Sequence, residues 1–257
     1  MTAPDSPRRA SGLLRADLEP RHWLGVTPTL DLMDDRLRFR VKSLTQLAKG
    51  ERERALALYA FVKPMPYCAP GRARFPTARQ LLDAGQGDCY GKSTLFVAML
   101  RLANIPARLR FVQLKGELLR GYVDGLDQVT HAIVEAWIDG RWVRTDTHVY
   151  DIRYLVAARD RLIRNDWDLG YSIHRKAQSI WDAKNDAFTA LTPDEGSGMP
   201  LADLGVFNDP QEFATYSRKQ EGAQPLLKKM RWNGFTARMA RGIAQLRAEE
   251  NAAYREA

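Results

Sequence analysis

Cys89 is a residue whose type and position could support covalent chemistry. It follows a glycine turn and opens an apolar stretch in GQGDCYGKSTLFVAML, residues 85–100. The apolar spacing predicts a buried helix that begins near Cys89. A helix N-terminus favours a thiolate, whereas the neighbouring Asp88 opposes it. The same stretch also suits a thiol that only packs in a core, so the assignment depends on whether the chain supplies a base.

A base can come from the segment THAIVEAWIDGRWVRTDTHVYD, residues 130–151. Asp139 and Gly140 separate two apolar runs and predict a hairpin with a two-residue type I′ turn. The register that follows predicts these opposite pairs: Ile138 with Arg141, Trp137 with Trp142, Glu135 with Arg144, Ile133 with Asp146, and His131 with His148. His131 and Asp146 then share one face of the hairpin, with their backbones about 7–8 Å apart.

A cysteine, a histidine and an aspartate in this arrangement suit nucleophilic catalysis. An imidazole can accept the thiol proton and later protonate a leaving amine. A carboxylate beside the imidazole holds its tautomer and stabilises its charged form. We therefore predict Cys89, His131 and Asp146 as the catalytic residues.

These segments resemble the transglutaminase-like superfamily. The resemblance rests on GDC at a helix start, on LRLANIPARLRFV at residues 100–112, and on HAIVEAWIDGRWVRTD at residues 131–146. It implies a papain-like α+β fold with N-terminal helices, a central nucleophile helix and an antiparallel sheet. It also implies acyl transfer through a thioester, with Cys89 as the nucleophile, His131 as the base and Asp146 as the orienting acid.

A tetrahedral intermediate needs hydrogen-bond donors aimed at its oxygen. The backbone N–H of Cys89 is one candidate, and the side-chain candidates are Gln86, Tyr67 and Trp142. The residues expected to line the substrate wall are Tyr90, Trp137 and His148. Cys68 lies in a proline-flanked loop with no evident base, and we expect no catalytic role for it.

Periodicity predicts four parts along the chain. Residues 1–20 are expected to be flexible, and residues 21–155 to form the catalytic core, with helices over 30–50 and 51–62 and a strand over 107–116. Residues 156–224 are predicted as an irregular and helical extension, including the loop TPDEGSGMP. Residues 225–257 are predicted as a basic helix. Its apolar stripe of Phe235, Met239, Ile243 and Leu246 is expected to dock on its own domain, although it could instead bind a partner.

Composition limits the remaining choices. The net charge of +8 favours acidic partners in general, but no motif selects nucleic acid. Two cysteines and no long apolar run favour a reduced, cytoplasmic protein without a membrane span. The other histidines (His22, His148 and His174) show no metal-ligand spacing, so neither a metal nor another cofactor is expected. The oligomeric state is left open.

Three functions follow from these residues. A thiol hydrolase acting on a peptide, protein or small amide substrate is slightly favoured. An acyltransferase that passes the thioester to an amine is the first alternative. A non-catalytic module that uses its basic tail to bind an acidic partner is the second.

Overall fold

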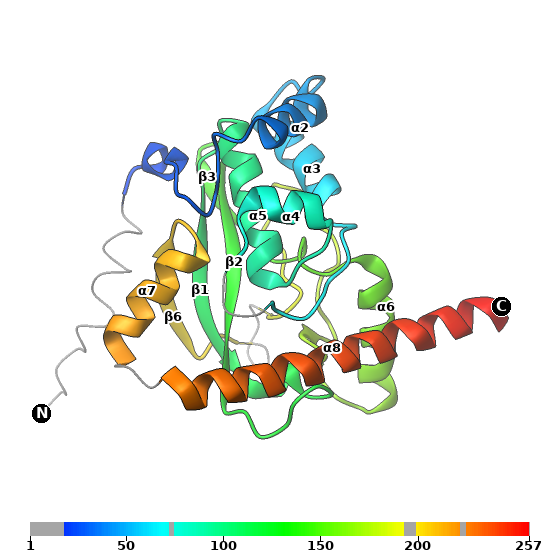
Figure 1. The fold of residues 1–257 in the computed structure, drawn as a ribbon. Coiled ribbons are helices and arrows are strands. Elements are labelled where there is room, and N and C mark those ends of the chain that lie inside the picture. The colour runs from blue at the N-terminus through cyan, green and yellow to red at the C-terminus, as the bar shows by residue number, and fades with distance from the viewer. Residues whose placement is uncertain (1–17, 72–74, 193–198, 222–224, 257) are drawn as a thin grey trace, which may run out of the picture.

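A computed structural model describes residues 18–71, 75–192, 199–221 and 225–256, with side chains given to Arg218 in the first of the two C-terminal helices and from Gly234 to Glu249 in the second. Its centre is a four-stranded antiparallel sheet in the order β3-β2-β1-β6 (Figure 1). The strands are β1 (Ala107–Lys115), β2 (Gln128–Ile138), β3 (Arg141–Thr145) and β6 (Ala202–Phe207). The α+β class predicted from the sequence is confirmed.

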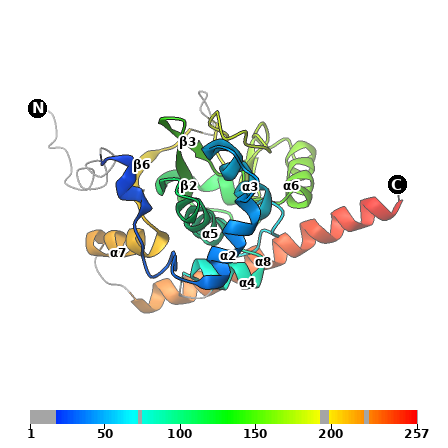
Figure 2. The same ribbon diagram turned by 90° about the horizontal axis from the view of Figure 1, so that it is seen from above.

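Helices cover one face of this sheet. They are α2 (Asp35–Thr45), α3 (Glu51–Val62), α4 (Ala78–Ala84) and α5 (Cys89–Leu102). Viewed from above, α5 lies nearly end-on between the sheet and the other three helices (Figure 2). Leu95, Phe96 and Met99 of α5 share one apolar core with Leu109 and Val134 of the sheet. The buried helix predicted after Cys89 therefore exists and lies at the centre of the fold.

Short elements cover the opposite face of the sheet. The 3-10 helix η2 (Gly116–Leu119) and the two-stranded ribbon of β4 (Leu169–Gly170) and β5 (Ile173–His174) lie there. Val112 and Ile133 of the sheet pack with Leu169, Phe188 and Leu191 in a second apolar cluster. The sheet is thus buried on both faces, so both sets of alternating side chains are constrained.

The β2–β3 hairpin follows the predicted register between Val134 and Ile138. Asp139 and Gly140 have φ angles of 51° and 79°, as a type I′ turn requires. The rings of Trp137 and Trp142 lie 5.4 Å apart. Regular pairing ends at Thr145, so the two further pairs predicted beyond it, Ile133 with Asp146 and His131 with His148, are not formed.

Glu135 lies opposite Arg144 as predicted, but the two side chains are not ion partners. Glu135 is buried and binds the guanidinium groups of Arg108 and Arg110 on β1, each at 2.6 Å. Arg144 binds Asp186 instead, at 2.7 Å. The backbone register of the hairpin was predictable from local pairs, whereas the ion-pair partners of Glu135 lie on the neighbouring strand β1.

The segment predicted as an extension contributes to the central sheet. β6 pairs with β1 on the side away from β2, and α7 (Pro210–Glu221) packs beside it. The helix α6 (Ile152–Arg164) follows the hairpin directly. Residues 193–198, which include most of the predicted TPDEGSGMP loop, and residues 1–17 lie outside the described residues.

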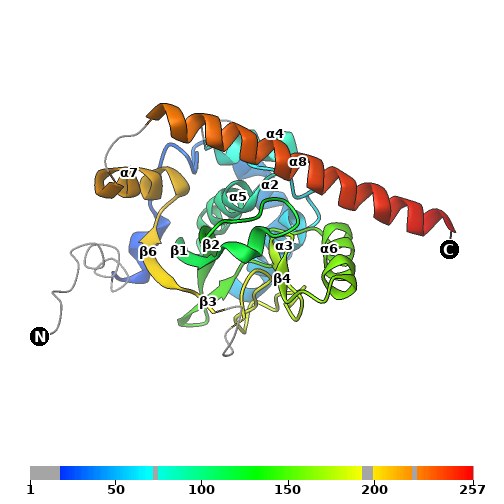
Figure 3. The same cartoon turned by 90° about the horizontal axis from the view of Figure 1, so that it is seen from below.

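The C-terminal helix α8 (Pro225–Glu256) crosses the lower side of the molecule in Figure 1, and in the view from below it runs past α4 along one side of the molecule (Figure 3). Met239, Ile243 and Leu246 are buried in an apolar cluster with tyrosines of the core, and Phe235 packs against it. The predicted docking of this stripe on its own domain is confirmed. Among the described helices, none combines the length and apolarity needed to cross a bilayer.

Candidate active site

Cys89 occupies the first position of α5, as the sequence predicts. Asp88 caps the helix, and its Oδ1 accepts a hydrogen bond of 2.7 Å from the backbone N–H of Gly91. Cys89 is half-buried and packs beside the tyrosine cluster. A nucleophile needs such partial access.

The geometry of α5 and β1 brings Cys89 level with the start of β2. The helix α5 has 14 residues and is about 21 Å long, which equals the length of about six strand residues. Its C-terminal end leads into β1, so Cys89 lies at the far end of that length. Six residues beyond Ala107, β1 reaches Gln113, which pairs with Thr130. Tyr90, next to Cys89, donates its hydroxyl to the carbonyl of Thr130 at 3.3 Å. Thr130 precedes His131, so the helix start lies beside the histidine's part of β2.

His131 and Asp146 form a buried hydrogen-bonded pair. Nε2 of His131 lies 2.8 Å from Oδ2 of Asp146. The same carboxylate accepts backbone N–H bonds from Thr189 at 2.5 Å and Ala190 at 3.0 Å. Nδ1 of His131 makes no hydrogen bond with any described residue. The imidazole is therefore held at one nitrogen and available at the other.

The surroundings of Cys89 favour the protonated thiol. Burial raises the pKa of Cys89 well above its usual value, and the charge of Asp88 raises it further. Hydrogen bonds from the N-terminal backbone of α5 act in the opposite direction but are outweighed. The resting sulfur is consequently a thiol at neutral pH, and its reaction requires a proton acceptor.

Tyr67, Gln86 and Tyr90 lie near the thiol. Tyr67 is buried in the cluster against which Cys89 packs, and its hydroxyl donates to Ser172 at 3.3 Å. Gln86 is exposed in the turn before α5, while Tyr90 is half-buried between Phe75 and Phe111. Tyr67 and Gln86 remain candidate oxyanion donors, and Tyr90 a candidate wall residue.

The positions of Trp142, Trp137 and His148 disagree with the expected roles. The two tryptophan rings pack edge to face near the turn of the hairpin, and Arg108 lies over the Trp142 ring at 3.9 Å. This pair is about 20 Å along β2 from His131. His148 is fully buried with Nε2 2.9 Å from Oγ of Ser93, so it cannot line a substrate groove.

Residues 38–147 match the family model of the Transglutaminase-like superfamily. The matched segment covers less than half of the chain. It contains Cys89, His131 and Asp146 and ends one residue after the aspartate. No curated protein matches the chain.

Two solved structures are similar to this chain. One is "a Putative Cysteine Protease from Cytophaga hutchinsonii", at 21% identity and a TM-score of 0.40, covering 51% of this chain and 43% of that one. The other is "a putative protease from Parabacteroides distasonis", at 19% identity and a TM-score of 0.35, covering 49% of this chain and 26% of that one. The present chain therefore spans less than half of either protein.

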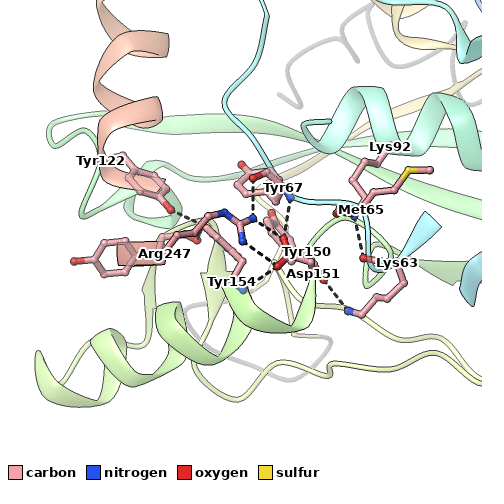
Figure 4. A network of polar contacts seen from close by, with 10 residues as sticks. Lys63, Met65, Tyr67, Lys92, Tyr122, Tyr150, Asp151, Tyr154 and Arg247 are labelled. Carbon is pink, nitrogen blue, oxygen red and sulfur yellow. Dashed lines mark hydrogen bonds and ion pairs between the residues drawn. The ribbon is translucent and has the colours of Figure 1, made fainter. Parts of the chain in front are cut away.

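Two lysines near the candidate site, the buried Lys92 and the half-buried Lys63, were not identified from the sequence. Nζ of Lys92 donates to the carbonyls of Lys63 and Met65, and Nζ of Lys63 donates to those of Thr147 and Tyr150 (Figure 4). They link α5 to the segment that follows Asp146. Lys92 lies one turn after Cys89, at a position on the buried side of α5, and this was the available signal.

A group of residues beyond the transglutaminase-like segment was also missed. Asp151, Tyr154 and Arg247 lie near Tyr67 in Figure 4, and they come from the start of α6 and from α8.

Within the described residues, no three His, Cys, Asp or Glu side chains converge on a position that could hold a metal ion.

Proposed function

We propose that the protein is a thiol-dependent acyl-transfer enzyme in which Cys89 attacks the carbonyl of a peptide, protein or small amide substrate. The observation that carries the proposal is the buried His131–Asp146 pair of 2.8 Å beside the N-terminal end of α5. Nδ1 of His131 is the nitrogen without a described partner, so it is the atom that would accept the thiol proton.

The reaction would proceed in two halves. In the first, the Cys89 proton moves to Nδ1 of His131 as the sulfur–carbon bond forms, and the proton then passes to the amine as the carbon–nitrogen bond breaks. In the second, an acceptor attacks the thioester, His131 takes its proton, and the thiol is restored. Asp146 would hold the imidazole orientation and stabilise its charged form throughout.

Water is our proposed acceptor, so the enzyme would be a cysteine hydrolase. Cys89 retains exposed surface, which would let water reach a thioester. An amine acceptor would use the same first half and would differ only in the product.

Alkylation tests the nucleophile. Burial raises the pKa of both thiols, that of Cys68 to about 11, so the proton acceptor has to separate them. We expect iodoacetamide to modify Cys89 much faster than Cys68 between pH 6 and 8, because His131 would take the Cys89 proton and no such base is assigned to Cys68. His131→Ala should slow Cys89 modification by on the order of tenfold or more and lower turnover by a factor of about 10² to 10⁴. The control is His22→Ala, an exposed histidine in η1 (Pro20–Leu24).

Equal and slow modification of both cysteines would contradict catalysis and favour a binding module. Product analysis then separates the two acceptors. Incubation with a glutamine-containing protein and a labelled amine should yield free acid or cleaved peptide if water is the acceptor. Incorporation of the label would identify an acyltransferase instead.

A further inference from the structure

Arg247 projects from the buried side of α8 toward the candidate active site. It follows Ile243 by one helical turn and therefore continues the apolar stripe, whose members Met239, Ile243 and Leu246 are only 3%, 5% and 2% exposed. Gly242 on the same face lies so close to Tyr122 that an added Cβ would be 2.4 Å from the ring. These contacts make α8 an integral part of the core that surrounds Cys89.

The ion pair of Arg247 and Asp151 binds the backbone of Tyr67 on both sides of its Cα, at the N–H and at the carbonyl. Nη2 lies 2.6 Å from Oδ2 of Asp151 and 3.1 Å from the carbonyl of Tyr67, and Nη1 lies 3.2 Å from Oδ1 of Asp151. Oδ2 of Asp151 also accepts the backbone N–H of Tyr67 at 2.9 Å. Both backbone polar groups of Tyr67 are thus bound by this ion pair (Figure 4).

The Tyr67 segment in turn supports the loop before Cys89. The N–H of Gly87 donates to the carbonyl of Pro66, and the N–H of Cys68 donates to the carbonyl of Gly87, each at 3.2 Å. Gly87 precedes Cys89 by two residues. Because these two hydrogen bonds join the segments, a displacement of the Tyr67 backbone would also displace the turn that precedes α5.

We propose that Arg247 is a positioning residue for the Cys89 nucleophile and that α8 is a structural part of the acyl-transfer site. The proposal rests on the function proposed above. Arginine suits this role because its planar fork donates in several directions at once, whereas a lysine ammonium cannot match that geometry. Cys89 stays half-exposed with α8 docked, so the helix supports the nucleophile rather than covering it.

The test compares Arg247→Met with Arg161→Met in a Cys68→Ser background, in which Cys89 is the remaining thiol. Arg161 of α6 binds Glu249 of α8 at 2.8 Å, so its loss weakens the same helix pair without touching Tyr67. Iodoacetamide modification of Cys89 is followed from pH 6 to 9, together with the melting temperature and turnover. Arg247→Lys serves as the conservative variant.

We expect Arg247→Met to slow Cys89 modification and turnover by about tenfold or more, since misplacement of a reacting group by an ångström can cost about a hundredfold. Arg161→Met should lower the melting temperature but leave the alkylation profile of the background protein unchanged. Arg247→Lys should recover part of the loss.

Two results would overturn the proposal. Alkylation profiles that match in Arg247→Met and Arg161→Met would reduce Arg247 to a stabilising contact. Faster modification of Cys89 in Arg247→Met would make α8 a cover. Failure of the proposed function has a different signature, because Cys89 of the background protein would then be unreactive and insensitive to His131→Ala.

Discussion

At the scale of single residues, Asp88 has two opposing effects on the thiol. Its carboxylate caps α5 through the N–H of Gly91, which fixes the helix start at Cys89. Its charge also raises the pKa of the Cys89 thiol, in the same direction as burial does. Replacing Asp88 by asparagine would separate the capping effect from the charge effect, because asparagine caps a helix about as well as aspartate.

Asp88→Asn should therefore make Cys89 more reactive. Loss of the neighbouring negative charge lowers the thiol pKa, so the thiolate fraction at pH 7 rises, and we expect a severalfold faster reaction with iodoacetamide. The pH dependence of the alkylation rate should shift toward lower pH. The matched control is Asp34→Asn, which replaces the cap of α2 and should leave Cys89 unchanged. An unchanged profile in Asp88→Asn would mean that Asp88 acts only as a cap.

At the scale of secondary structure, two glycines of α8 have opposite surroundings. An added Cβ at Gly242 would meet the ring of Tyr122 at 2.4 and 2.7 Å, whereas at Gly234 the nearest atom is the end of Arg238, 3.9 Å away. Glycine is a poor helix former at either position. The contact with Tyr122 explains why α8 tolerates a glycine on its buried side.

Gly242→Ala should destabilise the protein while Gly234→Ala stabilises it. Overpacking against Tyr122 costs about 1–3 kcal/mol, which exceeds the gain in helix propensity of up to about 1 kcal/mol. At Gly234 an added Cβ meets no close atom, so only the gain in helix propensity remains. Urea unfolding of the two variants measures both effects against the parent. Equal stabilisation by both substitutions would show that α8 can move away from Tyr122 without cost.

Elements with local signals were predictable from the sequence. The hairpin register followed from the Asp139–Gly140 turn and the Trp137–Trp142 pair, and the docking of α8 followed from its apolar stripe. β6 was missed because, among the described strands, it pairs with β1 alone, far away in the sequence, and because its short pattern does not alternate clearly. The same limit applies to the ion pairs of Glu135, whose partners Arg108 and Arg110 lie on β1 and not on the hairpin.

The residues of the candidate site also differ in whether the local sequence identifies them. Cys89, His131 and Asp146 could be selected because their residue types and local elements suggest a chemistry. Lys92 and Arg247 carry no such signal beyond a charge on an otherwise apolar helix face. Their partners are backbone carbonyls and a carboxylate from distant segments, which only the folded chain brings together.

At the scale of the whole molecule, the buried Lys92 and the half-buried Lys63 link stability to pH. Burial lowers the pKa of Lys92 to about 7 and that of Lys63 to about 8, both from 10.5. Between pH 7 and 10.5 the unfolded chain therefore holds more protons at Lys92 than the folded protein does. Stability from this group rises with pH across that window and is constant below it.

Lys92→Met should remove this part of the pH dependence. We expect the free energy of unfolding of the parent, minus that of the variant, to increase from pH 6.5 to 8.5 by on the order of 1–2 kcal/mol, with a limiting slope of about 1.4 kcal/mol per pH unit. Urea unfolding at each pH gives the difference. Lys42→Met, at an exposed position of α2, is the control and should show a flat difference. A flat difference for Lys92→Met would argue against the lowered pKa.

The place of β6 beside β1 also matters for biosynthesis. The ribosome releases the nucleophile helix and the hairpin well before residues 202–207, so the nascent chain carries β1 with one edge still open. Open edges pair readily with strands of other chains, which makes this interval the one in which chaperones are most needed. For the same reason, we expect a fragment that ends at residue 147 to leave this edge of β1 unpaired.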